Sequence, residues 1–229
     1  IQSKLLCWYK KNKRILPWRK LHKKKLPNPY HVLVSEFMLQ QTTVNAVVSR
    51  FKEFIKIWPN LKKLSVVNES QILQFWSGLG YYARAKNLLN SAKIISHKFN
   101  NIVPDNYNDL ISLPGVGDYT AKAILGIGYN KSVMPIDANI KRMLVRLYGL
   151  NQSINLINKK ITSLSKFFIS KKQSSNLIQA FMDYVSIICV PRNPRCSICI
   201  IAKECIANQK KITHIIPTKI KSKKTKMKK

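Results

Sequence analysis

A glycine-rich turn and an aspartate that follows it have the residue types and spacing that could bind an anion and take part in catalysis. The turn LPGVG (113–117) contains Gly115 and Gly117 and precedes a predicted helix over 118–129. Such a turn leaves backbone N–H groups unpaired, and these groups can bind a phosphate oxygen. Asp137 then begins another predicted helix. The segment predicts an anion-binding turn near a carboxylate, although an ordinary helix–helix turn and a simple N-cap aspartate have the same residue types.

Three acidic residues fall in mainly apolar helical surroundings. Glu36 lies between Val34 and Phe37, so burial should raise its pKa into the range that a general acid needs near neutral pH. Asp137 at a helix start should accept backbone N–H bonds and stay ionised. The alternative for Glu36 is a place on the rim of an amphipathic helix. Asp183 is interpreted as structural.

Four cysteines are spaced Cys189-x6-Cys196-x2-Cys199-x5-Cys205. Clustered cysteines in a chain without a signal-peptide pattern indicate metal ligation in a reducing compartment rather than disulfides. Structural zinc usually takes two close pairs with a longer spacer, whereas one CxxC in a compact loop suits a 4Fe–4S cluster. The spacing favours the cluster and leaves zinc as the alternative. Cys7, alone in an apolar helix, is predicted to be a core residue.

The charge of the chain points to a polyanionic partner. Lys and Arg number 41 against 9 Asp and Glu, which gives a net charge of +32. Nucleic acid is the simplest partner, although a compositional bias toward Lys, Asn and Ile would also inflate the charge. No apolar run approaches the roughly 18–20 residues that span a bilayer. We therefore expect a cytoplasmic, nucleoid-associated bacterial protein that acts as a monomer without a membrane.

The elements that must position these residues are helices. Apolar residues recur at three- and four-residue steps, and convincing β-hairpin signals are absent, so the predicted fold class is all-α. The predicted helices cover 3–12, 30–58 with a break near 41–43, 69–77, 81–99, 107–112, 118–129, 155–169 and 174–188.

Several short motifs together resemble one enzyme family. They are LPWR (16–19), SEFMLQQT (35–42), GLGYYARAKN (78–87), LPGVGDYTA (113–121), DANIKR (137–142) and the four clustered cysteines. With them the chain resembles the helix-hairpin-helix DNA glycosylases, and within these the adenine DNA glycosylase (MutY) family. The resemblance implies a six-helix domain packed on an iron–sulfur domain, with the active site between them. It divides the chain into part of the iron–sulfur domain (1–27), the six-helix domain (28–133), the rest of the iron–sulfur domain (134–213) and a basic, disordered tail (214–229).

The resemblance also implies an activity, the hydrolysis of adenine from A:8-oxoguanine or A:G mispairs in double-stranded DNA during base-excision repair. The adenine must be flipped out of the helix. Breaking its glycosidic bond needs an acid at the base and a negative charge near the sugar, as in other glycosidases. By resemblance Glu36 is the acid, Asp137 stabilises the sugar cation, Asn139 positions the site, and Tyr119 is the partner beside Asp137.

Further residues are assigned by the same resemblance. Gln41 and Tyr81 match residues that fill the helix near the orphaned 8-oxoguanine, and Gly115 and Gly117 would present amides to phosphate. The full set of substrate- or DNA-binding candidates is Trp18, Arg19, Gln41, Thr42, Tyr81, Gly115, Gly117 and Gln179. Candidate contacts to the DNA backbone are Arg84, Lys86, Lys141 and Arg142.

Two other functions remain as alternatives. Endonuclease III-type enzymes, which are glycosylase/lyases for oxidised pyrimidines, carry a nucleophilic Lys where this chain has Tyr119. Because tyrosine forms no Schiff base, a monofunctional enzyme is favoured. A non-catalytic helix-hairpin-helix module would need neither Glu36 nor Asp137.

The chain departs from the family pattern in three places. Ala138 stands where the family has Gly, the loop 21–28 is longer and basic, and the sequence ends at Lys229 without the usual domain that recognises 8-oxoguanine. The third departure predicts weaker preference for 8-oxoguanine over guanine.

Overall fold

The computed structural model describes residues 1–22, 25–152 and 154–217 of the chain. Within these ranges the structure is helical and contains no strand, only an isolated bridge between Leu21 and Pro27. The all-α prediction is confirmed. The disorder predicted for 214–229 is wrong for its described part, since Ile216 is buried and its carbonyl oxygen accepts a bond from Nε of Arg146. Residues 218–229 lie outside the described residues.

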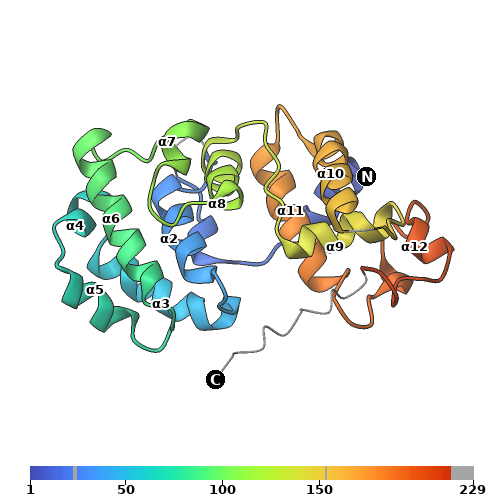
Figure 1. Cartoon of the computed structure of the whole chain (residues 1–229), viewed down its shortest axis with the longest axis horizontal. Coiled ribbons are helices and arrows are strands. Elements are labelled where there is room, and N and C mark those ends of the chain that lie inside the picture. Colours follow the sequence, from blue (N-terminus) through green and yellow to red (C-terminus); the bar gives the residue numbers. More distant parts are fainter. Residues whose placement is uncertain (23–24, 153, 218–229) are drawn as a thin grey trace, which may run out of the picture.

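The helices form two lobes (Figure 1). The first lobe contains α2 (Pro29–Leu39), α3 (Val44–Ile57), α4 (Leu61–Ser65), α5 (Glu69–Trp76), α6 (Ala83–Lys98), α7 (Tyr107–Ile111), α8 (Asp118–Ala123) and the π-helical turn Ile124–Gly128. The second lobe contains α1 (Gln2–Asn12), α9 (Ala138–Leu147), α10 (Ile154–Ser165), α11 (Ser174–Ile187) and α12 (Ile206–Gln209). Helix α1 belongs to the second lobe because it packs on α11.

Polar caps begin several helices where the sequence changes. Asn28 accepts a bond from the Tyr30 amide ahead of Pro29, and Thr43 accepts one from the Ala46 amide. A side-chain oxygen at the N-cap satisfies an amide that has no partner within the helix. The cap at Thr43 confirms the predicted break near 41–43.

A close approach of backbone joins the lobes. A Cβ added to Gly126 in the π-helical turn would lie 2.1 Å from Cδ1 of Ile178 on α11. A side chain at this position would require the terminal methyl group of Ile178 to move, so glycine permits the present packing. The turn and α11 thus pack closely and bring residues of α2, α8 and α11 to one cavity.

Two expectations differ from the structure. The short helices α4 and α12 were not predicted, since each has only four or five residues and shows no full helical period. The prediction that Cys7 is a core residue is wrong, because its side chain is exposed. Leu5 and Tyr9 form the buried face of α1, and Cys7, two residues from each, projects to the other side. No described helix has the length and apolar character to cross a bilayer.

Candidate active site

A cavity of about 360 Å³ lies between the lobes. It is lined by the segment after α1, by α2, α8 and α11, and by the start of α9. Seven of the residues predicted for the site line it: Trp18, Arg19, Glu36, Thr42, Tyr119, Asp137 and Asn139. The fold therefore gathers residues from four separate sequence motifs around one space.

Glu36 projects into this cavity from the buried face of α2. Its residue is 7% exposed, and the desolvation of the carboxylate raises its pKa to about 7, with a further contribution from the charge of Asp137. The charge of Arg19 and a hydrogen bond from Tyr119 act in the opposite direction. Glu36 can therefore hold a proton near neutral pH and release it to a bound group.

Tyr119 stands beside both carboxylates. Burial raises the pKa of its phenol well above the usual value, and the charges of Glu36 and Asp137 add to this effect. The hydroxyl thus stays protonated and acts as a hydrogen-bond donor to Glu36. A tyrosine at this place supplies polarity without a nucleophilic amine.

Asp137 is held by two donors at the start of α9. Its Oδ1 accepts the Ile140 amide at 2.7 Å, and its Oδ2 accepts Nδ2 of Asn139 at 2.8 Å. Asn139 is oriented in turn by Nη1 of Arg142, which donates to Oδ1 of Asn139 at 2.8 Å. The two bonds fix the orientation of the carboxylate toward the cavity. Ala138 is not among the residues with positive φ, so alanine fits this position without strain.

A buried aspartate anchors two arginines at the cavity. Asp183 on α11 is fully buried, and its Oδ1 accepts Nε of Arg14 at 2.6 Å while its Oδ2 accepts Nη1 of Arg19 at 2.8 Å. The structural interpretation of Asp183 is confirmed. Arg14 is a cavity residue that the sequence analysis missed, since a lone basic residue in a basic chain carries no signal. Gln179 is bonded to Tyr9 and Ser175 and is not among the residues that line the cavity.

Three turns lie beside the cavity. Gln41 and Tyr81 are exposed and have left-handed backbone, with φ of 56° and 51°. Gly115 also has positive φ, 75°, and a Cβ there would lie 2.8 Å from Cβ of Asn87. Gln40 donates to the carbonyl of Gly115 at 3.4 Å, which joins the first of these turns to the third. Gly117 is the N-cap of α8 and has ordinary extended backbone.

The candidate backbone contacts divide into two groups. Arg84 and Arg142 are buried and donate to internal carbonyl oxygens, so their predicted contact with DNA phosphates is wrong. Both arginines have basic neighbours in the sequence, and the sequence alone did not show that each lies on the buried side of its helix. Lys86 is exposed and Lys141 is partly exposed.

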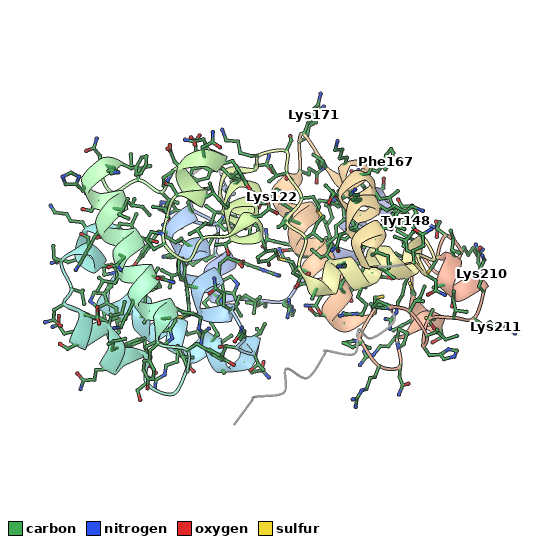
Figure 2. All side chains as sticks on the ribbon, in the orientation of Figure 1. Lys122, Tyr148, Phe167, Lys171, Lys210 and Lys211 are labelled. Carbon is green, nitrogen blue, oxygen red and sulfur yellow. The ribbon has the colours of Figure 1, made fainter. Side chains whose placement is uncertain are left out.

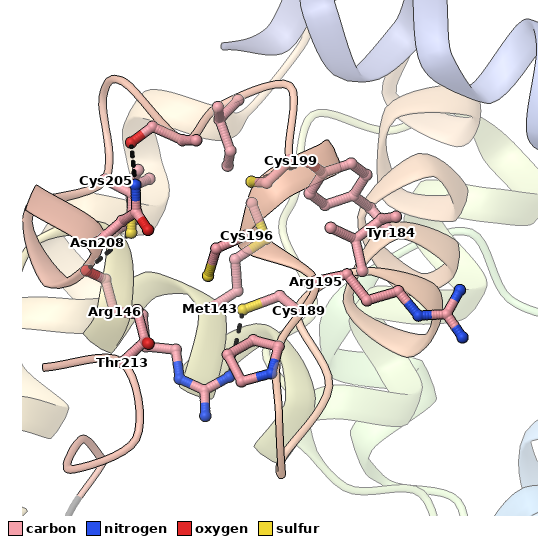
Figure 3. A pocket seen from close by; sticks show the side chains of 15 residues that line it. Met143, Arg146, Tyr184, Cys189, Arg195, Cys196, Cys199, Cys205, Asn208 and Thr213 are labelled. Carbon is pink, nitrogen blue, oxygen red and sulfur yellow. Dashed lines mark hydrogen bonds between the residues drawn. The ribbon is translucent and has the colours of Figure 1, made fainter. Parts of the chain in front are cut away.

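The four clustered cysteines surround a second cavity (Figure 3). The hydroxyl of Tyr184 donates to Sγ of Cys199 at 3.1 Å, and Nη1 of Arg146 donates to Sγ of Cys189 at 3.6 Å. Each of these bonds restrains the orientation of the sulfur that accepts it. Among the described residues no three His, Cys, Asp or Glu side chains converge on a single-ion site. The four cysteines line this cavity together with Met143, Arg146 and Tyr184.

Comparison with known proteins agrees with this geometry. Residues 34–167 match the model of the HhH-GPD superfamily of base excision DNA repair proteins. The chain is 41% identical over 218 residues to an adenine DNA glycosylase of Buchnera aphidicola from Acyrthosiphon pisum, covering 94% of this chain and 61% of that protein. It is 34% identical to the adenine DNA glycosylase of Mus musculus over 215 residues, covering 91% of this chain and 42% of that one.

A solved structure of a thermostable thymine-DNA glycosylase is also similar. It superposes with a TM-score of 0.81 at 27% identity, covering 91% of this chain and 95% of that chain. The chain spans about three fifths of the length of the Buchnera relative.

Proposed function

The chain belongs to the HhH-GPD superfamily of base excision DNA repair proteins, and from this premise we propose that it hydrolyses adenine from A:8-oxoguanine and A:G mispairs. The observation that carries the proposal is the pairing of Glu36, with a pKa of about 7, and Asp137 in one cavity. The similarity to adenine DNA glycosylases supports adenine as the base.

The two carboxylates have complementary tasks in this proposal. Protonated Glu36 donates its proton to the flipped adenine, which makes the purine a better leaving group. The Asp137 carboxylate, fixed by Ile140 and Asn139, stabilises the positive charge that develops on the sugar. Water then adds to the sugar and gives its proton to the Glu36 carboxylate, which leaves an abasic site and restores the acid. Tyr119 keeps its proton and forms no Schiff base, so the enzyme is monofunctional.

Recognition of the duplex uses the surface around the cavity. Trp18, Arg19 and Thr42 line the adenine pocket, while Gln41 and Tyr81 fill the space that the base vacates. The amides of the turn at Gly115 and Gly117 bind a phosphate. Gln179, which bonds to Tyr9 and Ser175, does not line the cavity and so makes no contact with the base in this proposal.

We also propose that Cys189, Cys196, Cys199 and Cys205 hold a 4Fe–4S cluster. When bound, the cluster ties the loop 189–205 together through four Fe–S bonds. The loop then presents basic residues such as Arg192 and Arg195 toward DNA phosphates. In this division the two lobes correspond to domains over 28–133 and over 134–213 with 1–27, and 214–229 forms the tail.

The test is single-turnover base release from duplexes containing A opposite 8-oxoguanine, A opposite G, A opposite T and T opposite G. We expect strand breaks only after alkali, and only with the first two duplexes. Glu36→Gln should abolish release while retaining binding, and Glu53→Gln on the exposed side of α3 is the matched control. Breaks without alkali would contradict the monofunctional assignment, and release only from T opposite G would replace adenine by thymine as the substrate.

A further inference from the structure

Arg84 is a buried arginine in the motif GLGYYARAKN (78–87), and it has no role in the reaction proposed above. Its residue is 6% exposed, although it lies near the surface turns beside the cavity. Burying a guanidinium costs free energy that its hydrogen bonds offset, and each bond it makes fixes the group that accepts it. Nε of Arg84 has no partner among the described residues, so the two terminal nitrogens make all of its bonds. The partners of Arg84 therefore show what it holds in place.

One end of the guanidinium binds the turn that follows α2. Nη1 contacts the carbonyl oxygens of Phe37 at 3.2 Å and of Met38 at 2.9 Å, together with the hydroxyl of Thr42 at 3.1 Å. It also contacts the carbonyl oxygen of Gln40. These acceptors lie on both sides of Gln41, whose φ is 56°.

The other end binds the turn that precedes α6. Nη2 donates to the carbonyl oxygens of Leu79 at 2.8 Å and Gly80 at 2.9 Å. The next residue, Tyr81, has φ of 51° and an exposed fraction of 63%. Its ring centroid lies 5.5 Å from Cζ of Arg84, so the guanidinium contacts both the turn and the aromatic side chain.

Gln41 and Tyr81 are thus two left-handed, exposed residues on turns that share one cation. A non-glycine residue with positive φ is strained and keeps this conformation only where its surroundings enforce it. Arg84 supplies that enforcement for both turns at once, and a single ammonium could not, because only the planar fork has two separate donor nitrogens.

We propose that Arg84 is a positioning residue for base flipping, which fixes Gln41 and Tyr81 as one preorganised wedge against the duplex. The inference rests on the proposed function, since it takes these two residues as the ones that enter the helix. Arg84 touches neither base nor sugar in this role. Its effect is confined to the extrusion step and passes through Gln41 and Tyr81.

The experiment separates flipping from chemistry. A duplex with 2-aminopurine in place of the target adenine is bound to the Glu36→Gln protein, in which base release is blocked, and fluorescence reports extrusion. We expect Arg84→Lys in this background to lower the extruded fraction or its rate about tenfold, a typical coupling between contacting groups. Arg50→Lys is the matched control, because Arg50 also donates to a carbonyl of the second turn, that of Ser77 at 2.8 Å, but has no bond to the first. It should leave extrusion within about twofold of the reference.

A comparison of combined variants tests the route through the two turns. Arg84→Lys should have little further effect when Gln41→Ala and Tyr81→Ala are already present together, whereas independent, additive effects would overturn the proposal. Equal losses in Arg84→Lys and Arg50→Lys would also overturn it, because general loosening of the lobe would then explain both. If Arg84→Lys does not fold, Thr42→Val, which removes one acceptor and keeps the side-chain volume, is measured in the same two backgrounds with the same criterion.

Failure of the proposed function would look different. In that case the unaltered protein would not release adenine from a mispair, and the Glu36→Gln protein would give no fluorescence change with the duplex. Normal base release and extrusion by the unaltered protein, with no effect of Arg84→Lys, would contradict the positioning role alone.

Discussion

At the scale of single residues, the burial of Glu36 provides the proton that the proposed reaction needs but lowers the stability of the fold once the carboxyl ionises. Burial raises the pKa of this carboxyl from 4.5 to about 7. A raised pKa means that the folded protein binds the proton more tightly than the unfolded chain does. The contribution of Glu36 to the free energy of unfolding is therefore fully favourable below pH 4.5, the pKa of the group in the unfolded chain. It is lost as pH rises through 7, the pKa in the folded protein.

Glu36→Gln should consequently stabilise the protein at pH 8, by up to about 3 kcal/mol, because the amide has no charge to desolvate. The gain should disappear toward pH 4.5, the ordinary value of the group. Urea unfolding between pH 5 and 8.5 measures the difference, with Glu53→Gln as the exposed control. A difference that does not vary with pH would contradict the assigned pKa.

The same carboxyl predicts the pH dependence of base release. The rate should fall as pH rises through about 7, because Glu36 then loses the proton that it must donate. Tyr119→Phe removes a hydrogen bond that lowers this pKa, so the descending limb should move to higher pH. Tyr107→Phe, which alters an exposed tyrosine bonded to Asp118, should leave the limb in place. A shift of the Tyr119→Phe limb to lower pH would contradict the bond to Glu36.

At the scale of elements, the segment after α1 is held on α11 by buried charge. Asp183 accepts bonds from the backbone and side chain of Arg14 and from the side chain of Arg19. These contacts fix one wall of the cavity. A second link, between Lys4 and Glu204 at 2.5 Å, joins α1 to the cysteine loop at the exposed surface.

Asp183→Asn should lower the free energy of unfolding by about 3 kcal/mol, because it leaves two arginines without their buried counter-charge. Glu204→Gln should not measurably change the free energy of unfolding, since water already solvates the charges of both Lys4 and Glu204. Thermal and urea unfolding of the two variants provide the comparison. Equal losses would show that burial does not distinguish the two links.

The cysteine loop gives a second prediction at this scale. Cys199→Ser should remove the visible absorbance and the iron and sulfide content of the purified protein, because one Fe–S bond is lost. Cys7→Ser should change neither, since Cys7 is exposed on α1 and is absent from the cavity lining. A colourless unaltered protein with stoichiometric zinc would contradict the cluster.

At the scale of the whole molecule, charge should dominate non-specific binding. Basic side chains are spread over both lobes (Figure 2), and the net charge is +32. Binding that neutralises phosphates releases counterions, so affinity falls as a power of the salt concentration.

Contact with only four phosphates would lower the affinity for undamaged duplex roughly 100-fold between 50 and 200 mM salt. Fluorescence anisotropy over this range measures the slope. Single-turnover base release at saturating DNA should change little, because the carboxylates act in a buried cavity. A slope near zero would remove nucleic acid as the reason for the charge.

Local sequence was sufficient to predict the positions of most helices in this protein. Apolar spacing and polar residues such as Thr43 and Asp137 set most helix positions, since a helix depends on neighbours three and four residues away. The motifs contain 11 of the 18 residues that line the cavity, and seven of these were named as site residues. Short helices such as α4 escaped prediction because they are stabilised by packing rather than by their own pattern.

The burial of individual side chains was decided only by the tertiary structure. Arg84 and Arg142 are internal, Cys7 is exposed, and Arg14 reaches the cavity. The partners involved lie far apart in the chain: Asp183 meets Arg14 and Arg19 across 169 and 164 residues. Desolvation and pairing depend on these distant neighbours. The sequence by itself therefore determined which groups are present and which helices hold them, while packing decided which of them are charged, satisfied or free to act.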